Sequence, residues 1–135
     1  MEINQLSGSI IDAAVKIHMQ LGPGLLESVY EQCMAIEFQQ RGIRCASQIP
    51  LPIVYAGHRI ESAYRLDLLV DDRIIVEIKA IEHILPVHKA QLLSYLRLTE
   101  KKLGLLLNFN VPRMREGIYR IVNSLYSDVP DTLPV

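Results

Sequence analysis

The sequence predicts one α/β domain, over residues 1–135, with elements in the order helix, helix, three strands, helix, strand. Hydrophobic spacing is helical at first, alternates through the middle of the chain, and is helical again before a short continuous apolar run. A chain of 135 residues can bury a core without disulfides or a structural metal. With 50% hydrophobic and 21% charged residues, the composition excludes a disordered or fibrous protein.

Two helices are expected before the strands. The first ends at Gly22–Gly24, where glycine and proline break a helical stripe made of Leu6, Ile10, Ala14, Ile17 and Leu21. The second runs from about Leu26 to Gln40, with Gly42 at the position of a C-terminal cap. Its expected buried stripe is Leu26, Val29, Cys33 and Ile36, and the neighbouring face carries Glu27, Tyr30 and Met34.

Residues 48–80 are rich in alternating and β-branched residues, which predicts a three-stranded meander. Its turns are expected at residues 56–58 and 71–73, and Pro50 and Pro52 place the first strand at an edge because proline cannot donate to a ladder. A helix is expected over residues 86–99, followed by a strand buried on both faces within residues 102–110. Residues 117–123 fit either a strand or a helix, and the tail, about 127–135, is expected to be loose.

Charge and cysteine usage limit the partners. A net charge of -1 and a pI near 6.4 argue against gripping long DNA through bulk positive charge, so nucleic-acid contacts must be local. Basic residues cluster within 101–120, but a solvated surface explains this cluster better than a nucleic-acid contact does. No leader or membrane span is evident, so we expect a cytoplasmic protein with no membrane partner. Cys33 and Cys45 form no framework, and we expect both to be reduced.

Three charges interrupt the apolar pattern of the second and third expected strands: Asp67, Glu77 and Lys79. The parity of the two strands groups seven apolar residues on one face, namely Tyr64, Leu66, Leu68, Val70, Ile74, Val76 and Ile78. A three-residue loop at 71–73 then opposes Val70 to Ile74 and Asp67 to Glu77. Opposed carboxylates repel, so they favour a cation between them: Lys79 supplies one charge, and a hard divalent ion such as Mg²⁺ would supply the rest. The alternative is an ordinary polar outer strand face.

A further motif, Gly24-x-x-Glu27-x-x-Tyr30, precedes these strands. With it, the chain resembles the GxxExxY protein family, a branch of the PD-(D/E)XK nuclease superfamily, over roughly residues 5 to 125. The resemblance implies a PD-(D/E)XK nuclease-like core, with a mixed central sheet of about four to five strands flanked by helices. The proline that names the signature is absent, and Leu66 precedes Asp67.

The resemblance also implies roles for residues. Glu27, Asp67 and Glu77 would hold Mg²⁺ or Mn²⁺, Lys79 would orient water or stabilise phosphate charge, and Gln91 would match a helix glutamine of the superfamily. His88, Gln91 and Tyr95 share one helix face and could line the same cleft, and Tyr30 is a second candidate for substrate contact. Each residue also has a structural explanation that needs no catalytic role. These are a helix-dipole contact for Glu27, packing for Tyr30, capping for Gln91, and a structural role for His88.

The expected activity is metal-dependent hydrolysis of phosphodiester bonds in nucleic acid. We expect DNA as the substrate ahead of RNA. A homodimer or a partner subunit is expected to complete the substrate groove, because the chain has little positive charge of its own. Two other classes stay open: an inactive nuclease-fold adaptor that binds nucleic acid or protein, and a purely structural protein. The resemblance by itself does not establish activity.

Overall fold

The computed structural model describes residues 1–61 and 64–125. Its central sheet has five strands in the order β1-β4-β5-β6-β7, namely Cys45–Pro50, Arg65–Val70, Ile74–Lys79, Leu103–Asn108 and Ile118–Val122. Neighbouring strands are antiparallel except β5 and β6, which are parallel. The sheet is therefore mixed, and the predicted α/β class is confirmed.

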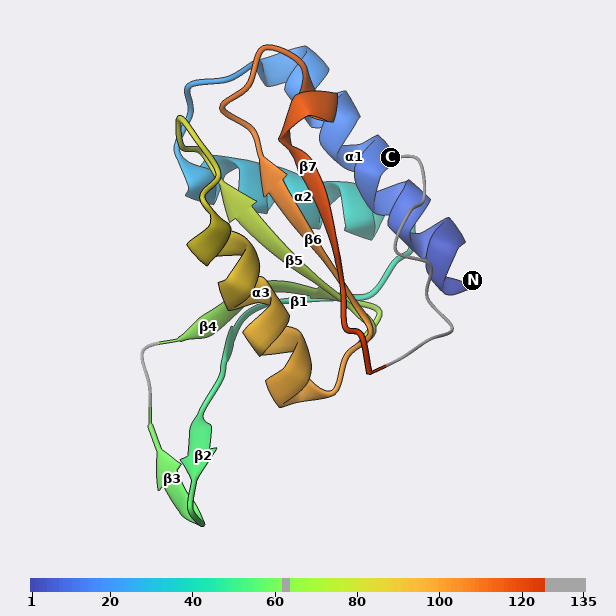
Figure 1. Ribbon diagram of the computed structural model, residues 1–135. Helices are drawn as coiled ribbons and strands as arrows, with labels where there is room; N and C mark the ends of the chain where they lie inside the picture. Colours follow the sequence, from blue (N-terminus) through green and yellow to red (C-terminus); the bar gives the residue numbers. More distant parts are fainter. Residues whose placement is uncertain (62–63, 126–135) are drawn as a thin grey trace.

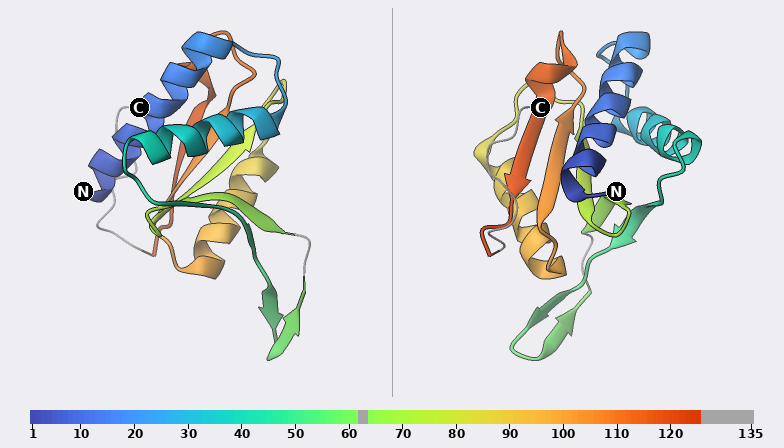
Figure 2. Two further views of the ribbon diagram at one scale, coloured as in Figure 1. Left: turned by 180° about the vertical axis from the view of Figure 1, so that it is seen from behind. Right: turned by 90° about the vertical axis from the view of Figure 1, so that its right-hand side faces the viewer.

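Helices cover both faces of this sheet (Figure 2). On one face lie α1 (Ile3–Leu21) and α2 (Glu27–Gln40), and on the other lies α3 (Pro86–Thr99), which connects β5 to β6. The larger core cluster joins α1 and α2 to one side of the sheet, and a smaller one joins α3 to the other side. The strand β6 is buried along its whole length between the two clusters, as its continuous apolar sequence predicts.

The predicted meander is confirmed in its connections, but it is divided between two sheets. Of the four described strands that precede β5, only β1 and β4 belong to the central sheet, where they pair with each other, and Pro50 is at the end of the edge strand as expected. The chain between them forms β2 (Ile53–Tyr55) and β3 (His58–Ile60), a separate two-stranded sheet that projects from the body (Figure 1). The turn at residues 56–57 falls where glycine predicts it, with Ala56 and Gly57 both at positive φ.

The predicted buried stripe of α2 is wrong for Leu26 and Ile36, whereas Cys33 packs partly buried against the core. Leu26 and Ile36 are 74% and 52% exposed, whereas the core receives Tyr30, Met34 and Phe38 at i, i+4 spacing. The apolar residues of this helix extend around most of its circumference, so spacing alone did not fix which face is buried. The predicted cap is confirmed: Gly42 has φ 69°, and the Ile43 amide donates to the Phe38 carbonyl at 2.9 Å.

Two further segments are settled by the structure. Residues 118–122, which fitted either type of element, form β7, an antiparallel edge strand that follows a short 3₁₀ helix, Met114–Gly117. Leu21, predicted at the end of the first buried stripe, is the last residue of α1 and is 43% exposed, so the buried stripe ends before it. The tail predicted to be loose, about residues 127–135, lies outside the described residues.

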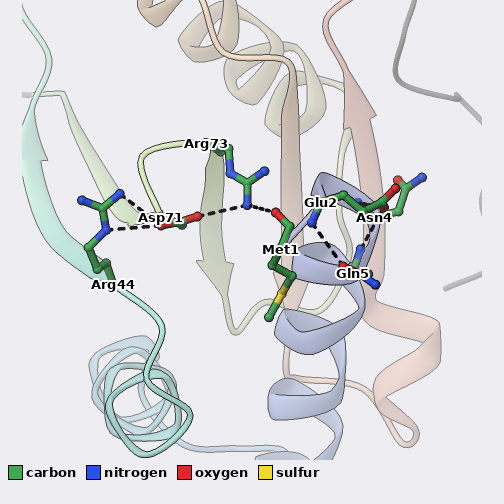
Figure 3. A network of polar contacts seen from close by, with 7 residues as sticks. All are labelled: Met1, Glu2, Asn4, Gln5, Arg44, Asp71 and Arg73. Carbon is green, nitrogen blue, oxygen red and sulfur yellow. Dashed lines mark hydrogen bonds and ion pairs between the residues drawn. The ribbon is translucent and has the colours of Figure 1, made fainter.

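The start of α1 is tied to the turn between β4 and β5 by a polar network (Figure 3). Arg73 donates to the Met1 carbonyl oxygen and to Asp71 Oδ2, and Arg44 donates to the other oxygen of the same carboxylate. Glu2 caps the helix by accepting from the Asn4 and Gln5 amides. The network connects segments far apart in sequence and leaves the opposite end of the β4–β5 hairpin to the site.

Within the described residues, no helix combines the length and the apolar character that crossing a bilayer requires.

Candidate active site

The two acids of the hairpin bond to each other's strands. The predicted register is confirmed up to Leu68 and Val76, with Val70 opposite Ile74. Beyond that point Asp67 donates its backbone amide to Glu77 Oε2 at 2.8 Å, and Ile78 donates its amide to Asp67 Oδ2 at 2.8 Å. Carboxylate oxygens thus replace backbone carbonyls as acceptors, and the two strands separate where the acids lie.

The strands β1 and β4 change faces at the same level. Leu68 and Val70 lie in the core beneath α1 and α2, but Leu66 packs with the residues of α3. Gln48, across from Asp67, has φ 52° within the strand β1, a conformation that L-residues seldom adopt. The prediction that Tyr64 and Leu66 share the core face of Leu68 is therefore wrong, because strict alternation stops at Gln48 and Asp67.

A pocket of about 270 Å³ opens beside the two strands, between them and α2. Its lining includes Glu27, Asp67 and Ile78. Glu27 is the first residue of α2, and its Oε1 accepts from the Ala80 amide at 3.2 Å, directly after the end of β5. The helix residue of the motif therefore lies at the same edge of the sheet as Asp67 and Lys79.

The electrostatics show that negative charge is in excess here. Burial, followed by the charges of the Asp67 and Glu31 carboxylates, raises the pKa of Glu77 to about 8, against the opposing effects of the Asp67 amide and Lys79. Burial also raises the pKa of Asp67, against the hydrogen bond from Ile78 and the charge of Lys79. Glu77 is only 5% exposed, so water does little to screen these charges. The site as a whole favours the arrival of a cation.

Two residues of the pocket were missed at the level of sequence. Glu31, one helical turn after Glu27, lines the pocket, and its pKa is raised by burial and by Asp67 and Glu27. The Gln48 side chain donates to Glu31 Oε1 at 2.6 Å and to Asp67 Oδ1 at 3.5 Å. The i, i+4 spacing of Glu27 and Glu31 was a usable signal for the first. No local signal marks Gln48, because its place depends on strand pairing.

Tyr30, proposed to contact substrate, does not reach the pocket. It is fully buried, its ring stacks on Phe109 at 4.3 Å, and its hydroxyl donates to the Gly22 carbonyl at 2.6 Å and accepts from the Leu25 amide. The expected substrate role is therefore corrected to a structural one. Tyr30 fixes the loop that precedes α2 through its contacts with Gly22 and Leu25. Because Glu27 directly follows this loop, Tyr30 also helps to position Glu27.

None of the three predicted residues of α3 lines the acid pocket, although Tyr95 is close enough to respond to the charges of Glu77 and Asp67. His88 Nδ1 accepts from the Leu85 amide at 2.9 Å, which makes His88 a cap of the helix start. Gln91 and Tyr95 line a different groove, of about 360 Å³, on the α3 side of the sheet. Burial and the charges of Glu77, Tyr64 and Asp67 raise the pKa of Tyr95 to about 12, so its hydroxyl stays protonated next to these acids. We expected the α3 residues to line the same cleft as the acids, but neither His88 nor Gln91 lines the acid pocket.

The donor set fits a hard divalent ion. Glu27, Asp67 and Glu77 offer carboxylate oxygens, the ligands that Mg²⁺ and Mn²⁺ prefer, in a place that lacks positive charge. Over residues 1–61 and 64–125, no three acidic, histidine or cysteine side chains converge closely enough to hold an ion as they stand. The carboxylates would have to turn from their backbone donors toward the ion.

A mixed sheet with helices on both faces, and an acid pair with a lysine on two central strands, define a nuclease-like α/β protein. Residues 4–121 match the family model described as the PD-(D/E)XK nuclease superfamily. The match covers most of the chain, and the protein belongs to this superfamily. Nucleases of the superfamily typically use divalent metal ions. Comparisons with curated proteins and with solved structures gave no significant match.

Proposed function

We propose that the protein is a metal-dependent nuclease that hydrolyses phosphodiester bonds of nucleic acid. The observation that carries the proposal is the meeting of Asp67, Glu77 and Lys79 with Glu27 at the separated ends of β4 and β5. A purely structural sheet would gain nothing from placing a buried carboxylate with a raised pKa against a second acid.

In this proposal Glu27, Asp67 and Glu77 hold Mg²⁺ or Mn²⁺. When bound, the ion would polarise the phosphodiester and make water a stronger nucleophile at neutral pH. The protein's own part is to fix the three carboxylates on three elements, with α2 positioned by Tyr30 and the two strands by their reciprocal hydrogen bonds. Such preorganisation keeps the ligands in place during the reaction.

Lys79 would bind and orient the phosphate. It lies on the same strand face as Glu77 and two residues further along, and its charge opposes the rise in pKa of both hairpin acids. A compact ammonium group is suited to stabilising the negative charge that develops on phosphate oxygens.

The finer assignments are also proposals. The motif of Gly24, Glu27 and Tyr30 supports membership in the GxxExxY branch, in which Tyr30 acts through the position of Glu27. DNA is proposed ahead of RNA as the substrate. Gln91 lines the neighbouring groove, so its proposed part is contact with flanking substrate rather than with the ion.

Cleavage of mixed DNA and RNA substrates with Mg²⁺ or Mn²⁺ tests the proposal. We expect wild type to cleave, and Lys79→Ala and Glu77→Ala to lose roughly 100-fold or more in rate, the usual effect of removing a charge-stabilising group. Lys16→Ala removes a half-exposed lysine of α1 and serves as the matched control, with expected wild-type cleavage. Equal cleavage by all four proteins would reveal a contaminant and refute the assignment.

A nuclease-fold adaptor remains the alternative function. It would bind nucleic acid but neither bind Mn²⁺ nor cleave, and calorimetric titration of wild type with Mn²⁺ distinguishes the two. Measurable Mn²⁺ binding that is lost in Asp67→Ala supports the nuclease.

A further inference from the structure

The two strands β2 and β3, residues 53–60, form an arm that receives little support from its own chain. Its strands have three residues each, and in the described structure they pair only with each other. Every residue from Val54 to Ile60 is exposed, and the arm extends away from the body in all views (Figures 1 and 2). An isolated two-stranded hairpin is at best marginally stable in water. The arm therefore needs an outside surface to pack on.

The arm carries exposed apolar side chains along its length. Val54 and Tyr55 are 63% and 74% exposed, and Ile60 is 49% exposed. The charges of Arg59 and Glu61 are paired with each other. Large apolar side chains with few free charges are typical of protein interfaces, in which aromatic residues are enriched and charged ones are depleted.

The same chain also has a groove of matching character, at the base of the arm beside α3. Its apolar lining consists of Ile53, the first residue of the chain's own arm, together with Tyr64, Val87, Ala90, Tyr95 and Leu98. Val87 and Leu98 are 64% and 48% exposed. Its polar members, Gln91 and Ser94, carry no charge, and no described residue of the lining is charged. The groove is thus an uncharged surface about 360 Å³ in volume.

We propose that the arm of one chain packs in the α3 groove of a second copy, and that the second copy does the same in return. Each chain presents both an apolar arm and an uncharged groove, so a two-fold axis satisfies both at once. The match in charge argues for this occupant over nucleic acid, because a phosphate backbone requires cations and the groove has none. The second arm would then lie beside Tyr95, whose pKa responds to Glu77 and Asp67, so the dimer contact borders the candidate active site.

Reciprocal packing makes a specific prediction for paired variants. Tyr55→Glu alters only the arm and Leu98→Arg alters only the groove, at side chains that are exposed in the chain itself. Each variant alone should be monomeric at concentrations at which wild type is dimeric. An equimolar mixture should be dimeric again, since one arm then places an acid against an arginine and the other contact is unaltered.

Sedimentation velocity over a range of concentrations provides the measurement, with circular dichroism to verify that each variant is folded. Met19→Glu, at an 81% exposed residue of α1 outside the arm and groove, is the control and should dimerise as wild type does. A monomeric wild type, single variants that remain dimeric, or a mixture that stays monomeric would each overturn the proposal. A monomeric wild type whose nucleic-acid binding falls in Tyr55→Glu would assign the arm to nucleic acid instead.

Discussion

At the scale of single residues, the site depends on two carboxylates that replace carbonyls of the sheet ladder. Asp67 and Glu77 each accept a backbone amide of the opposite strand, so each acid is held in place by the strand that carries the other. The arrangement keeps both acids close despite their repulsion, at the expense of a raised pKa for Glu77.

The raised pKa of Glu77 predicts how stability depends on pH. Without metal, folded Glu77 keeps its proton up to about pH 8, whereas an unfolded glutamate releases it near 4.5. The unfolded state thus binds fewer protons in this window, so the free energy of unfolding should fall as pH rises, by at most about 1.4 kcal/mol per pH unit from this group. Glu77→Gln should remove most of this decrease. Denaturant unfolding in the presence of EDTA measures it.

The control for this experiment is Glu82→Gln, which removes a carboxyl whose side chain is 90% exposed and should retain the wild-type slope. Equal slopes in wild type and Glu77→Gln would mean that Glu77 is ionised in the folded protein. A bound divalent ion should act in the opposite direction, since it favours the ionised carboxylates, and its affinity should rise with pH.

At the scale of residues, the sequence predicted the structure best where local rules determine which residues pair. Parity and loop length were enough to predict that Val70 pairs with Ile74 and Leu68 with Val76, because the turn at 71–73 fixes register. Beyond these pairs the regular ladder ends, and Asp67 contacts Glu77 through its backbone amide. The same two rules failed at Leu66, where the side chains change faces. This change coincides with the unusual backbone of Gln48, which lies on the partner strand β1 and is distant in sequence. Gln48 and its contact with Glu31 could not be predicted for the same reason.

At the scale of elements, the loops at the site's edge of the sheet have strict steric requirements. Asn108, at the end of β6, accepts from the Ile81 amide and donates to the Ile81 carbonyl, which fixes the chain just after Lys79. Gly117 comes so close to this strand end that a β-carbon would stand 1.9 Å from the Asn108 carbonyl oxygen. The segment before β7 therefore supports the segment that carries the lysine.

Gly117→Ala should consequently destabilise the protein by about 2 to 3 kcal/mol or more, because backbone rather than a flexible side chain must move. Gly8→Ala is the matched control, since a β-carbon there meets nothing within 4 Å, and a helical alanine should be neutral or slightly stabilising. Thermal or urea unfolding compares the two. A Gly117→Ala variant as stable as wild type would show that the strand end yields easily and does not fix the loop.

Element boundaries were largely predictable, but helix orientation was not. The helix over residues 86–99 was predicted to the residue, because Pro86 starts it and apolar spacing sustains it. For α2 the spacing was ambiguous, and the buried face was decided by Tyr30, whose ring stacks on Phe109 of a distant segment. Such contacts have no local trace in the sequence.

At the scale of the whole molecule, the sheet brings together residues from three distant segments. Glu27 arrives from the first helical layer, Asp67 and Glu77 from the antiparallel hairpin, and α3 places Tyr95 across the sheet. The projecting arm was not foreseen, because alternation continues through residues 45–70 and gives no sign of where pairing passes from one sheet to another. The superfamily match accounts for the scaffold, and the acid cluster accounts for the proposed chemistry.

The most direct test of the central claim is the position of Mn²⁺ in crystals of the protein, measured by anomalous diffraction. The account predicts a peak within coordination distance of the Asp67 and Glu77 carboxylates, with Glu27 turned toward it, and no such peak in Glu77→Ala. A protein that cleaves nucleic acid with Mn²⁺ while its peak lies away from these side chains would contradict it.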